Sequence, residues 1–393
     1  MSFKYKITIF KELIEKYPEW NSLRSYLESD VGGMLRVSSE DENGLCIIKY
    51  EKNESIMTLP HSKWFRSVVW NTHSNRPVCV APPKANADKL DDTIDVSNHV
   101  YQEFHDGFMI NCFKEVSTDV MHITTRSKLD ASGKFYSQKT FKELFLETIP
   151  DFMNGEFNTY VPDSSKCETA VFYSFLIQHP EHRIVKPIEN PSIYIIHKGI
   201  VLNDGTIEIV DSPTEFNSVL SVKPIIELNN KDIKKYLLEK DWRFQGIVIK
   251  DMYGNRRRYR NDRYLAVKTL RGNIPNSIDR FSQLYVQNLV SEYVEYYPED
   301  TLLIGSFMIV MDLMCKVTYT YYVSFHINKR ITLDMIDKMF WTHLYNIHGI
   351  YLTKLRQENK KVSINDVVTY FHKQPWQRVA FIIKKLSEND NSV

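Results

Sequence analysis

Residues 76–86 read RPVCVAPPKAN, and residues 101–113 read YQEFHDGFMINCF. The first segment predicts a strand that two consecutive prolines end, so that Lys84 follows in extended backbone. The second is rich in large apolar residues and predicts a buried strand that contains Asp106 and Gly107. A glycine in a strand lets a ligand approach the backbone closely, and a neighbouring carboxylate can contact that ligand. Together the segments predict a binding pocket, although Asp-Gly taken alone is more typical of a bulge or a tight strand entry.

The composition is that of a globular chain rather than a disordered one. Hydrophobic residues make up 43% of the 393 residues and charged residues 25%, which suits two domains, or a large domain with a smaller one. The net charge of +1 argues against a strongly basic surface but leaves room for a local basic patch. The five cysteines are scattered without metal-ligand spacing, so we expect buried thiols in a reducing compartment.

The hydropathy pattern predicts neither export nor membrane insertion. Residues 1–20 carry acidic side chains and lack an uninterrupted apolar core, so they are unlike a signal peptide. The most apolar window, residues 302–315, is interrupted by Gly305, Ser306 and Asp312 and predicts a buried helix. We therefore expect a cytoplasmic protein that makes no membrane contact.

The sequence pattern changes twice along the chain. Residues 1–30 predict a helical segment, residues 31–273 predict mostly short strands joined by turns, and residues 274–393 are helical in period almost throughout. We therefore expect an α+β fold, in which an antiparallel-sheet domain is followed by an all-helical C-terminal domain. Within the helical part, Ser363 and Asp366 match a capping box.

A basic stretch lies between two further predicted strands, residues 244–250 and residues 264–268. Its five arginines, with tyrosines interleaved among them, are Arg256, Arg257, Arg258, Arg260 and Arg263. Positive charge beside aromatic rings suits single-stranded nucleic acid. A solvated hairpin turn is an equally good interpretation of the same residues.

The order of segments is more informative than any one of them. From residue 43 onward, the chain reads NGLCIIKYE, RPVCVAPPKAN, EFHDGFMINCF, HITTRSK, FYSFLIQHPEHRIV, FQGIVIK and YLAVKTLRGN. This order resembles the adenylation domain of bacteriophage-type, ATP-dependent RNA ligases, a branch of the covalent nucleotidyltransferase superfamily. It is most similar to the ligase-like proteins of large nucleocytoplasmic DNA viruses.

The resemblance implies a nucleotide pocket and an RNA-binding turn. The residues that match nucleotide-binding positions of the family are Lys84, Asp106, Gly107, Arg126, Gly246 and Lys268. The RNA-binding residues would be Arg256, Arg257, Arg258, Arg260 and Arg263.

Several positions depart from the family pattern. Phe104 stands where the family has the lysine of Lys-x-Asp-Gly, and phenylalanine cannot form a lysyl–AMP phosphoramidate. Ser174 replaces the glutamate that holds the ribose, and Gln245 replaces a metal-binding glutamate and has no charge to hold Mg²⁺. Ala266 replaces the first of two lysines, and Asn43 replaces an arginine.

These departures favour a catalytically degenerate RNA ligase. Such a pseudo-ligase would bind nucleotide, RNA or a partner protein without forming lysyl-AMP, with no catalytic residue and no metal ligand. In one alternative the chain is an active ATP-dependent RNA ligase that uses Mg²⁺, with Lys84 or Lys250 as a relocated nucleophile. In another it is a structural protein that binds a partner through its helical domain. For a viral protein, the host cytoplasm, a virus factory or the virion is expected.

Overall fold

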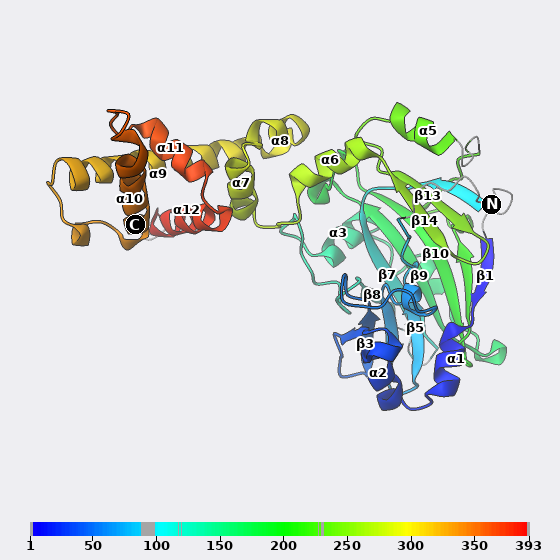
Figure 1. The fold of residues 1–393 in the computed structure, drawn as a ribbon. Helices are drawn as coiled ribbons and strands as arrows, with labels where there is room; N and C mark the ends of the chain where they lie inside the picture. The colour runs from blue at the N-terminus through cyan, green and yellow to red at the C-terminus, as the bar shows by residue number, and fades with distance from the viewer. Residues whose placement is uncertain are drawn as a thin grey trace. The chain divides into compact units, whose positions relative to one another are not determined.

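The computed structural model describes residues 3–87, 99–116, 118, 120–226, 228 and 232–390. The chain forms two compact units, Met1–Leu265 and Ala266–Val393. Among the residues that the structure describes, all strands lie in the first unit, and the second unit is helical (Figure 1). The predicted α+β fold with antiparallel sheets and a helical C-terminal region is therefore confirmed. The division falls inside helix α6 (Asp262–Arg271), whereas the sequence places the boundary after residue 273.

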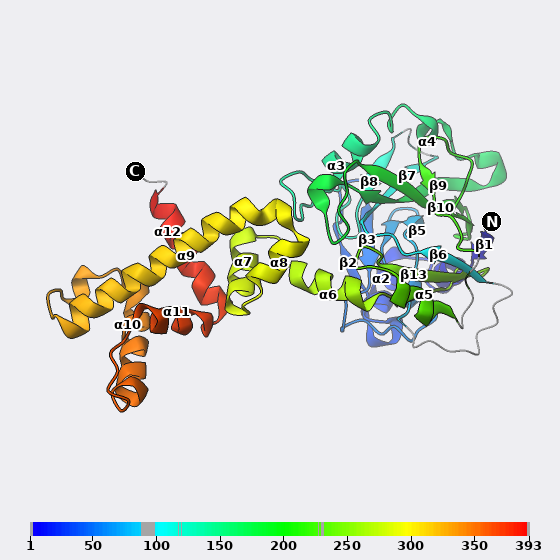
Figure 2. The same ribbon diagram turned by 90° about the horizontal axis from the view of Figure 1, so that it is seen from above.

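The largest sheet of the first unit is built almost entirely of antiparallel strands. In spatial order its strands are β1 (Phe3–Ile7), β11 (Ile207–Asp211), β10 (Ser192–Leu202), β9 (Glu168–Gln178), β7 (Phe108–Glu115) and β8 (His122–Thr124), and β12 (Leu220–Ser221) joins β10 in parallel. Helices α3 (Phe141–Thr148) and α4 (Glu156–Thr159) pack on one face, as Figure 2 shows. Phe145, Phe157 and Phe175 form the core beneath them.

A second sheet packs against the other face of the large one. Its strands are β2 (Arg36–Ser38), β3 (Leu45–Lys49), β4 (Val68–Asn71) and β5 (Arg76–Val80), in that order. Helices α1 (Ile9–Lys16) and α2 (Trp20–Glu28) join the same apolar core, which includes Phe10, Leu23, Trp70 and Phe172. The first seven residues include strand β1 rather than helix alone, because Phe3–Ile7 pairs with β11 along its whole length.

A third, three-stranded sheet has the order β14 (Arg256–Arg260), β13 (Gly246–Asp251) and β6 (His99–Glu103). Helix α5 (Ile233–Glu239) covers one of its faces through an apolar cluster that includes Tyr101, Ile233, Ile249 and Tyr259. The basic stretch is thus a paired strand rather than the predicted turn. In strand β14, Tyr259 is the residue that packs into the apolar cluster. A single apolar residue does not produce the alternating pattern by which a strand is predicted from sequence.

Two other local predictions are wrong. Residues 101–113 do not form one strand, because the chain leaves β6 after Glu103 and enters β7 at Phe108. Residues 264–268 lie in helix α6 instead of a strand. At the start of this helix, the Asn261 side chain accepts a hydrogen bond from the Arg263 amide at 3.0 Å, which is the geometry of an N-terminal cap.

The second unit contains six helices that lie wholly within it, among the residues that the structure describes. They are α7 (Ser277–Val286), α8 (Val290–Tyr296), α9 (Thr301–Tyr322), α10 (Lys338–Ile350), α11 (Ile364–His372) and α12 (Trp376–Asp390). The predicted capping box of Ser363 and Asp366 is confirmed at the start of α11. Asp300 is buried and accepts hydrogen bonds from Arg271 at 2.7 Å and Arg280 at 3.4 Å.

Helix α9 contains the apolar window that was predicted to be buried. Leu302, Ile309 and Leu313 are instead exposed by 86%, 71% and 55%, so that prediction is wrong for this face of the helix. By length and composition alone, Pro298–Ile327 is apolar enough to cross a membrane, and a third of its most apolar window is buried.

Candidate functional site

Asp106 lies in the bend between β6 and β7 and is 7% exposed. One carboxylate oxygen, Oδ2, accepts hydrogen bonds from the Val185 and Lys186 amides at 2.9 and 3.1 Å. The other, Oδ1, accepts the Tyr264 hydroxyl at 2.9 Å. Three protein donors therefore hold this carboxylate, and they tie together segments that are distant in sequence.

Two glycines that the sequence assigns to the pocket serve close contacts between strands. Gly107 has a φ of +155°, and a Cβ there would lie 2.4 Å from the Ile177 carbonyl oxygen. Gly246 has a φ of +147°, and a Cβ there would lie 2.2 Å from the Tyr259 carbonyl oxygen. Both positions exclude a side chain because a neighbouring strand occupies the space.

Phe104 follows β6 directly. Its amide donates to the Gly246 carbonyl at 2.9 Å, which extends the pairing of β6 with β13 by one residue. Its partly buried ring centre lies 5.6 Å from the guanidinium carbon of Arg260. A cation over an aromatic face at this distance is attracted by the negative π surface. An aromatic ring beside an arginine thus occupies position 104.

A buried polar row crosses the large sheet at Asn111, Ser174 and His197, which are register partners on β7, β9 and β10. The Ser174 hydroxyl donates to Asn111 Oδ1 at 2.6 Å and lies 2.9 Å from His197 Nε2. His197 Nε2 also lies 3.0 Å from the Val80 carbonyl oxygen on β5. Ser174 is fully buried, so its hydroxyl is enclosed within this polar row.

His197 should make the first unit sensitive to acid. Burial lowers the pKa of His197 from 6.5 to about 3, so the imidazole stays neutral in the folded state. An unfolded chain binds a proton there below pH 6.5, and stability therefore falls as the pH drops from 6.5 towards 3, by on the order of 4 kcal/mol. We expect His197→Gln to flatten this part of the pH profile of urea unfolding. If both proteins lose stability equally over this interval, His197 is not the titrating group.

Lys250, on β13, forms a buried ion pair. Its Nζ lies 2.6 Å from Asp211 Oδ1 and 3.4 Å from the Ser212 hydroxyl, and the residue is 3% exposed. Burial lowers the pKa of Lys250 to about 8, in spite of the opposing charge of Asp211. Burial by itself would raise the pKa of Asp211, but the charges of Lys250 and Arg256 lower it. The lysine is engaged by this carboxylate and is not presented to a ligand.

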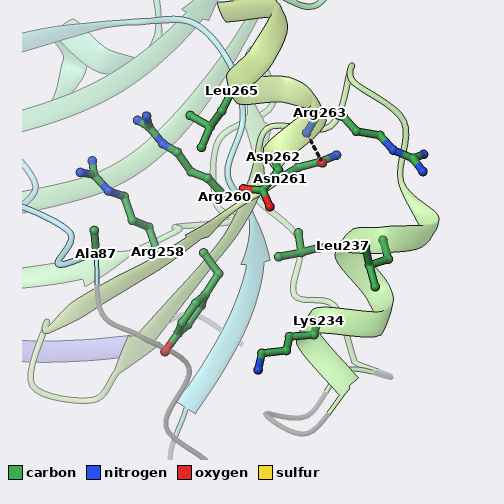
Figure 3. Close-up of a pocket in the computed structure, with 11 residues that line it drawn as sticks. Ala87, Lys234, Leu237, Arg258, Arg260, Asn261, Asp262, Arg263 and Leu265 are labelled. Carbon is green, nitrogen blue, oxygen red and sulfur yellow. Dashed lines mark hydrogen bonds between the residues drawn. The ribbon is translucent and has the colours of Figure 1, made fainter. Parts of the chain in front are cut away.

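The predicted RNA-binding arginines lie in three places, namely the two faces of strand β14 and the start of helix α6. Arg256, Arg258 and Arg260 alternate along one face and are named here the arginine row. Figure 3 shows Arg258 and Arg260 projecting to the same side of β14. Arg257 shares the opposite face with Tyr259, towards the apolar cluster under α5. Arg263 lies in α6 and donates to the Lys240 carbonyl at 3.3 Å.

Further cations surround one end of the arginine row. The ring of Tyr50 has Lys84 Nζ at 5.2 Å and the guanidinium carbon of Arg126 at 5.0 Å. Arg126 also donates to the Tyr50 and Arg66 carbonyls at 2.7 and 3.2 Å. Arg66, partly buried, lies near enough to the row for Arg256 to affect its pKa. The cationic cluster is defined as Arg66, Lys84, Arg126, Arg256, Arg258 and Arg260.

Carboxylates balance the cationic cluster only in part, since the charge of Asp211 acts on Arg256 and that of Asp106 acts on Arg260. The pKa of Arg66 is lowered to about 10, first by burial and then by the charges of Arg256, Arg126 and Arg258. Within the described residues, Arg66 and Arg258 have no side-chain hydrogen bond or ion pair. With a pKa of about 10, Arg66 remains protonated near neutral pH. The mutual repulsion of the cations would be relieved by a bound anion.

A cavity of about 650 Å³ lies beside the arginine row. Figure 3 draws the side chains that line it. Its lining is Ala87, Lys234, Leu237, Leu238, Arg258, Tyr259, Arg260, Asn261, Asp262, Arg263 and Leu265. Four of these side chains are basic and one is a carboxylate, so the cavity continues the positive surface.

The sequence interpretation missed Arg66 and Tyr50. The only signal for Arg66 was a single charged residue inside the apolar run WFRSVVW. Lys268 was assigned to the pocket, and it belongs to helix α6 and to the second unit.

The side chains around these positions do not fit Mg²⁺. Gln245 is neutral and 6% exposed, and its Oε1 has no hydrogen-bond partner in the described part of the chain. Asp211 is paired with Lys250, and Asp106 is held by three protein donors. Mg²⁺ requires carboxylate or phosphate oxygens in octahedral geometry. These side chains therefore do not form a site for Mg²⁺.

Comparisons with known proteins give a likeness to solved structures only. No protein-family model matches the chain, and no curated protein matches it. Among solved structures, it is similar to an archaeal ATP-dependent RNA ligase, with 11% identity over 76% of this chain and 73% of that chain, and a TM-score of 0.37. A likeness at this TM-score supports no functional conclusion.

Proposed function

We propose that this protein is an RNA ligase-like pseudoenzyme, which binds nucleotide or RNA at its cationic cluster without forming lysyl-AMP. The observation that carries the proposal is the placement of Phe104. Its ring stands at the nucleophile position of the resemblance and packs against Arg260. A phenyl ring has no lone pair with which to attack an α-phosphate, whereas the surrounding arginines still attract phosphate.

The surroundings of Phe104 support the proposal. Ser174 is fully buried and hydrogen bonded, and Lys250 is buried in its pair with Asp211. Lys84 is partly exposed beside the Tyr50 ring, so it is the remaining lysine that an active ligase could use. Catalysis by phosphoryl transfer depends on positioned cations and metal together, and Gln245 stands where the resemblance places a metal-binding glutamate.

Intact-protein mass spectrometry after incubation with ATP and Mg²⁺ tests the proposal. We expect no increase in mass, because Phe104 stands where the resemblance places the lysine that takes the adenylate. An active ATP-dependent RNA ligase, treated in parallel, should gain one adenylate and controls for the conditions. A gain of one adenylate by this protein, lost in Lys84→Ala, would establish the active alternative.

A protein partner for the helical unit is a second candidate function. The exposed apolar residues Leu302, Ile309 and Leu313 on α9 favour it. Under this alternative, the thermal stability of the full chain should not respond to any nucleotide or RNA. A rise in melting temperature with RNA would favour the first proposal. We place the protein in the cytoplasm without membrane contact, and in infected cells or the virion if it is viral.

A further inference from the structure

We propose that the arginine row binds the backbone of an extended single-stranded nucleic acid, with Arg256, Arg258 and Arg260 each taking one successive phosphate. The proposal rests on the function proposed above and names its ligand. A nucleoside triphosphate is the competing ligand, because it too would be attracted by the cationic cluster.

The spacing of the row distinguishes the two ligands. Side chains at alternate positions of a strand are about 6.7 Å apart, so the row from Arg256 to Arg260 spans about 13 Å. This interval is close to the separation of successive phosphates in an extended single strand. The phosphates of one triphosphate are directly linked through shared oxygens, and their chain is shorter than the row. A triphosphate would therefore reach only part of the row, whereas a single strand can engage all of it.

The row is kept straight and oriented by its own strand. Gly246 to Lys250 pair residue by residue with Arg260 to Arg256, which fixes the backbone of β14. On the other side, the Asn86 amide donates to the Arg256 carbonyl, and the Arg258 amide donates to the Asn86 carbonyl, both at 2.9 Å. The guanidinium groups project from a backbone that is hydrogen bonded on both edges. This rigidity reduces the ordering cost of binding.

The charges along the row favour a polyanion. Arg258 has no side-chain hydrogen bond or ion pair among the described residues, and Arg260 contacts the Phe104 ring and feels the charge of Asp106. Arg256 feels the charge of Asp211, but this carboxylate already binds Lys250. Positive charge also continues to Arg66 and Arg126 at one end. Phosphate oxygens would supply the missing acceptors without a divalent metal.

Aromatic rings lie near both ends of the row. Phe104 contacts Arg260, and Tyr50 lies in the group of cations near Arg256. Stacking of a base on an aromatic ring tolerates any sequence, since every base has a π face. The cavity of about 650 Å³ beside Arg258 and Arg260 could hold one nucleotide of the bound strand that turns away from the arginine row. We expect binding that depends on chain length and ionic strength more than on sequence.

Fluorescence anisotropy with labelled oligonucleotides that lack a 5′ phosphate tests the ligand. For the full-length protein, affinity should rise steeply with length up to oligonucleotides that carry at least three phosphates, and mixed sequences should bind alike. ATP should compete at least tenfold less well than such an oligonucleotide. A triphosphate that binds as tightly as every oligonucleotide, with no dependence on length, would overturn the proposal.

Three single substitutions test the row itself. Arg258→Ala should weaken oligonucleotide binding about tenfold and reduce the slope of log Kd against log salt by about 0.7, the contribution of one phosphate contact. Arg258→Lys keeps the charge and should keep most of the salt slope. Arg257→Ala is the matched control, because it removes the same charge from the opposite face of β14. Equal losses in Arg257→Ala and Arg258→Ala would show that general charge, rather than the row, attracts the strand.

The outcomes separate this inference from the proposed function. An adenylate adduct in the mass measurement would overturn the pseudoenzyme assignment, whatever the length dependence. Folded protein that forms no adduct and binds no oligonucleotide would overturn the arginine row while leaving the pseudoenzyme assignment in place. Far-ultraviolet circular dichroism of each variant would confirm that lost binding is not lost structure.

Discussion

Replacing Asp211 with alanine is expected to lower the free energy of unfolding of the first unit by about 3–5 kcal/mol. The carboxylate is buried and lies 2.6 Å from Lys250 Nζ, which is itself 3% exposed. Without Asp211, the ammonium group would be buried beside Arg256 with no opposing charge. Urea unfolding of the full chain, followed by tryptophan fluorescence and fitted to separate transitions for the two units, measures this loss.

A matched double substitution separates the lost pair from the lost packing. Lys250→Met removes the stranded ammonium group, so Asp211→Leu combined with Lys250→Met should recover most of the stability that Asp211→Ala loses. The loss in Asp211→Ala should also shrink as the pH rises towards 8. The paired Lys250 has a pKa of about 8, and without Asp211 the buried ammonium group releases its proton at a lower pH, which removes the uncompensated charge from the folded state. If Asp211→Ala lowers the free energy of unfolding by less than about 1 kcal/mol, the pair contributes no more than an exposed ion pair does, and the prediction is wrong.

Replacing Asp106 with alanine is expected to cost about 3 kcal/mol or more, because it leaves several buried donors without an acceptor. The donors are the Val185 amide, the Lys186 amide and the Tyr264 hydroxyl. Thermal and urea unfolding should both report the loss. Tyr264→Phe removes one of these donors and should cost only about 1 kcal/mol.

The same variant distinguishes a structural role of Asp106 from a ligand-binding role. If Asp106 served the ligand, Asp106→Ala would keep wild-type stability and lose affinity for nucleotide or oligonucleotide. If it anchors the bend between β6 and β7, stability falls first. Any remaining folded protein should then bind through Arg258 almost as the wild type does.

Much of the architecture could be predicted from sequence pattern. Strands near residues 170–178 and 244–250 are marked by continuous apolar runs, and they form β9 and β13. The predictions of secondary structure failed where the local sequence pattern favours one structure and the hydrogen bonds of the folded chain form another. Residues 264–268 contain strand-forming residues but follow the Asn261 cap and become helix α6. Residues 256–260 are nearly all arginine, so their hydrogen bonds to β13 and to Asn86 could not be anticipated.

The candidate site was predictable only in part. The positions of Phe104, Lys84 and Arg126 follow from the order of motifs along the chain. The cationic cluster around Tyr50 also includes Arg66, which could not be predicted. Arg66 lies near Arg256 and Arg258, which are about 190 residues further along the chain. Such neighbours depend on how the three sheets pack, and no local periodicity records that packing.

By itself, the sequence determined the α+β first unit, the helical second unit and the absence of a lysine at position 104. These properties follow from hydrophobic periodicity and from residue identity, which are local. Only the tertiary structure decided that Asp106 is held by protein donors, that Lys250 is paired with Asp211, and that one face of β14 carries charge that carboxylates balance only in part. The physical reason is that burial, pairing and charge compensation depend on partners that packing brings together from distant parts of the chain.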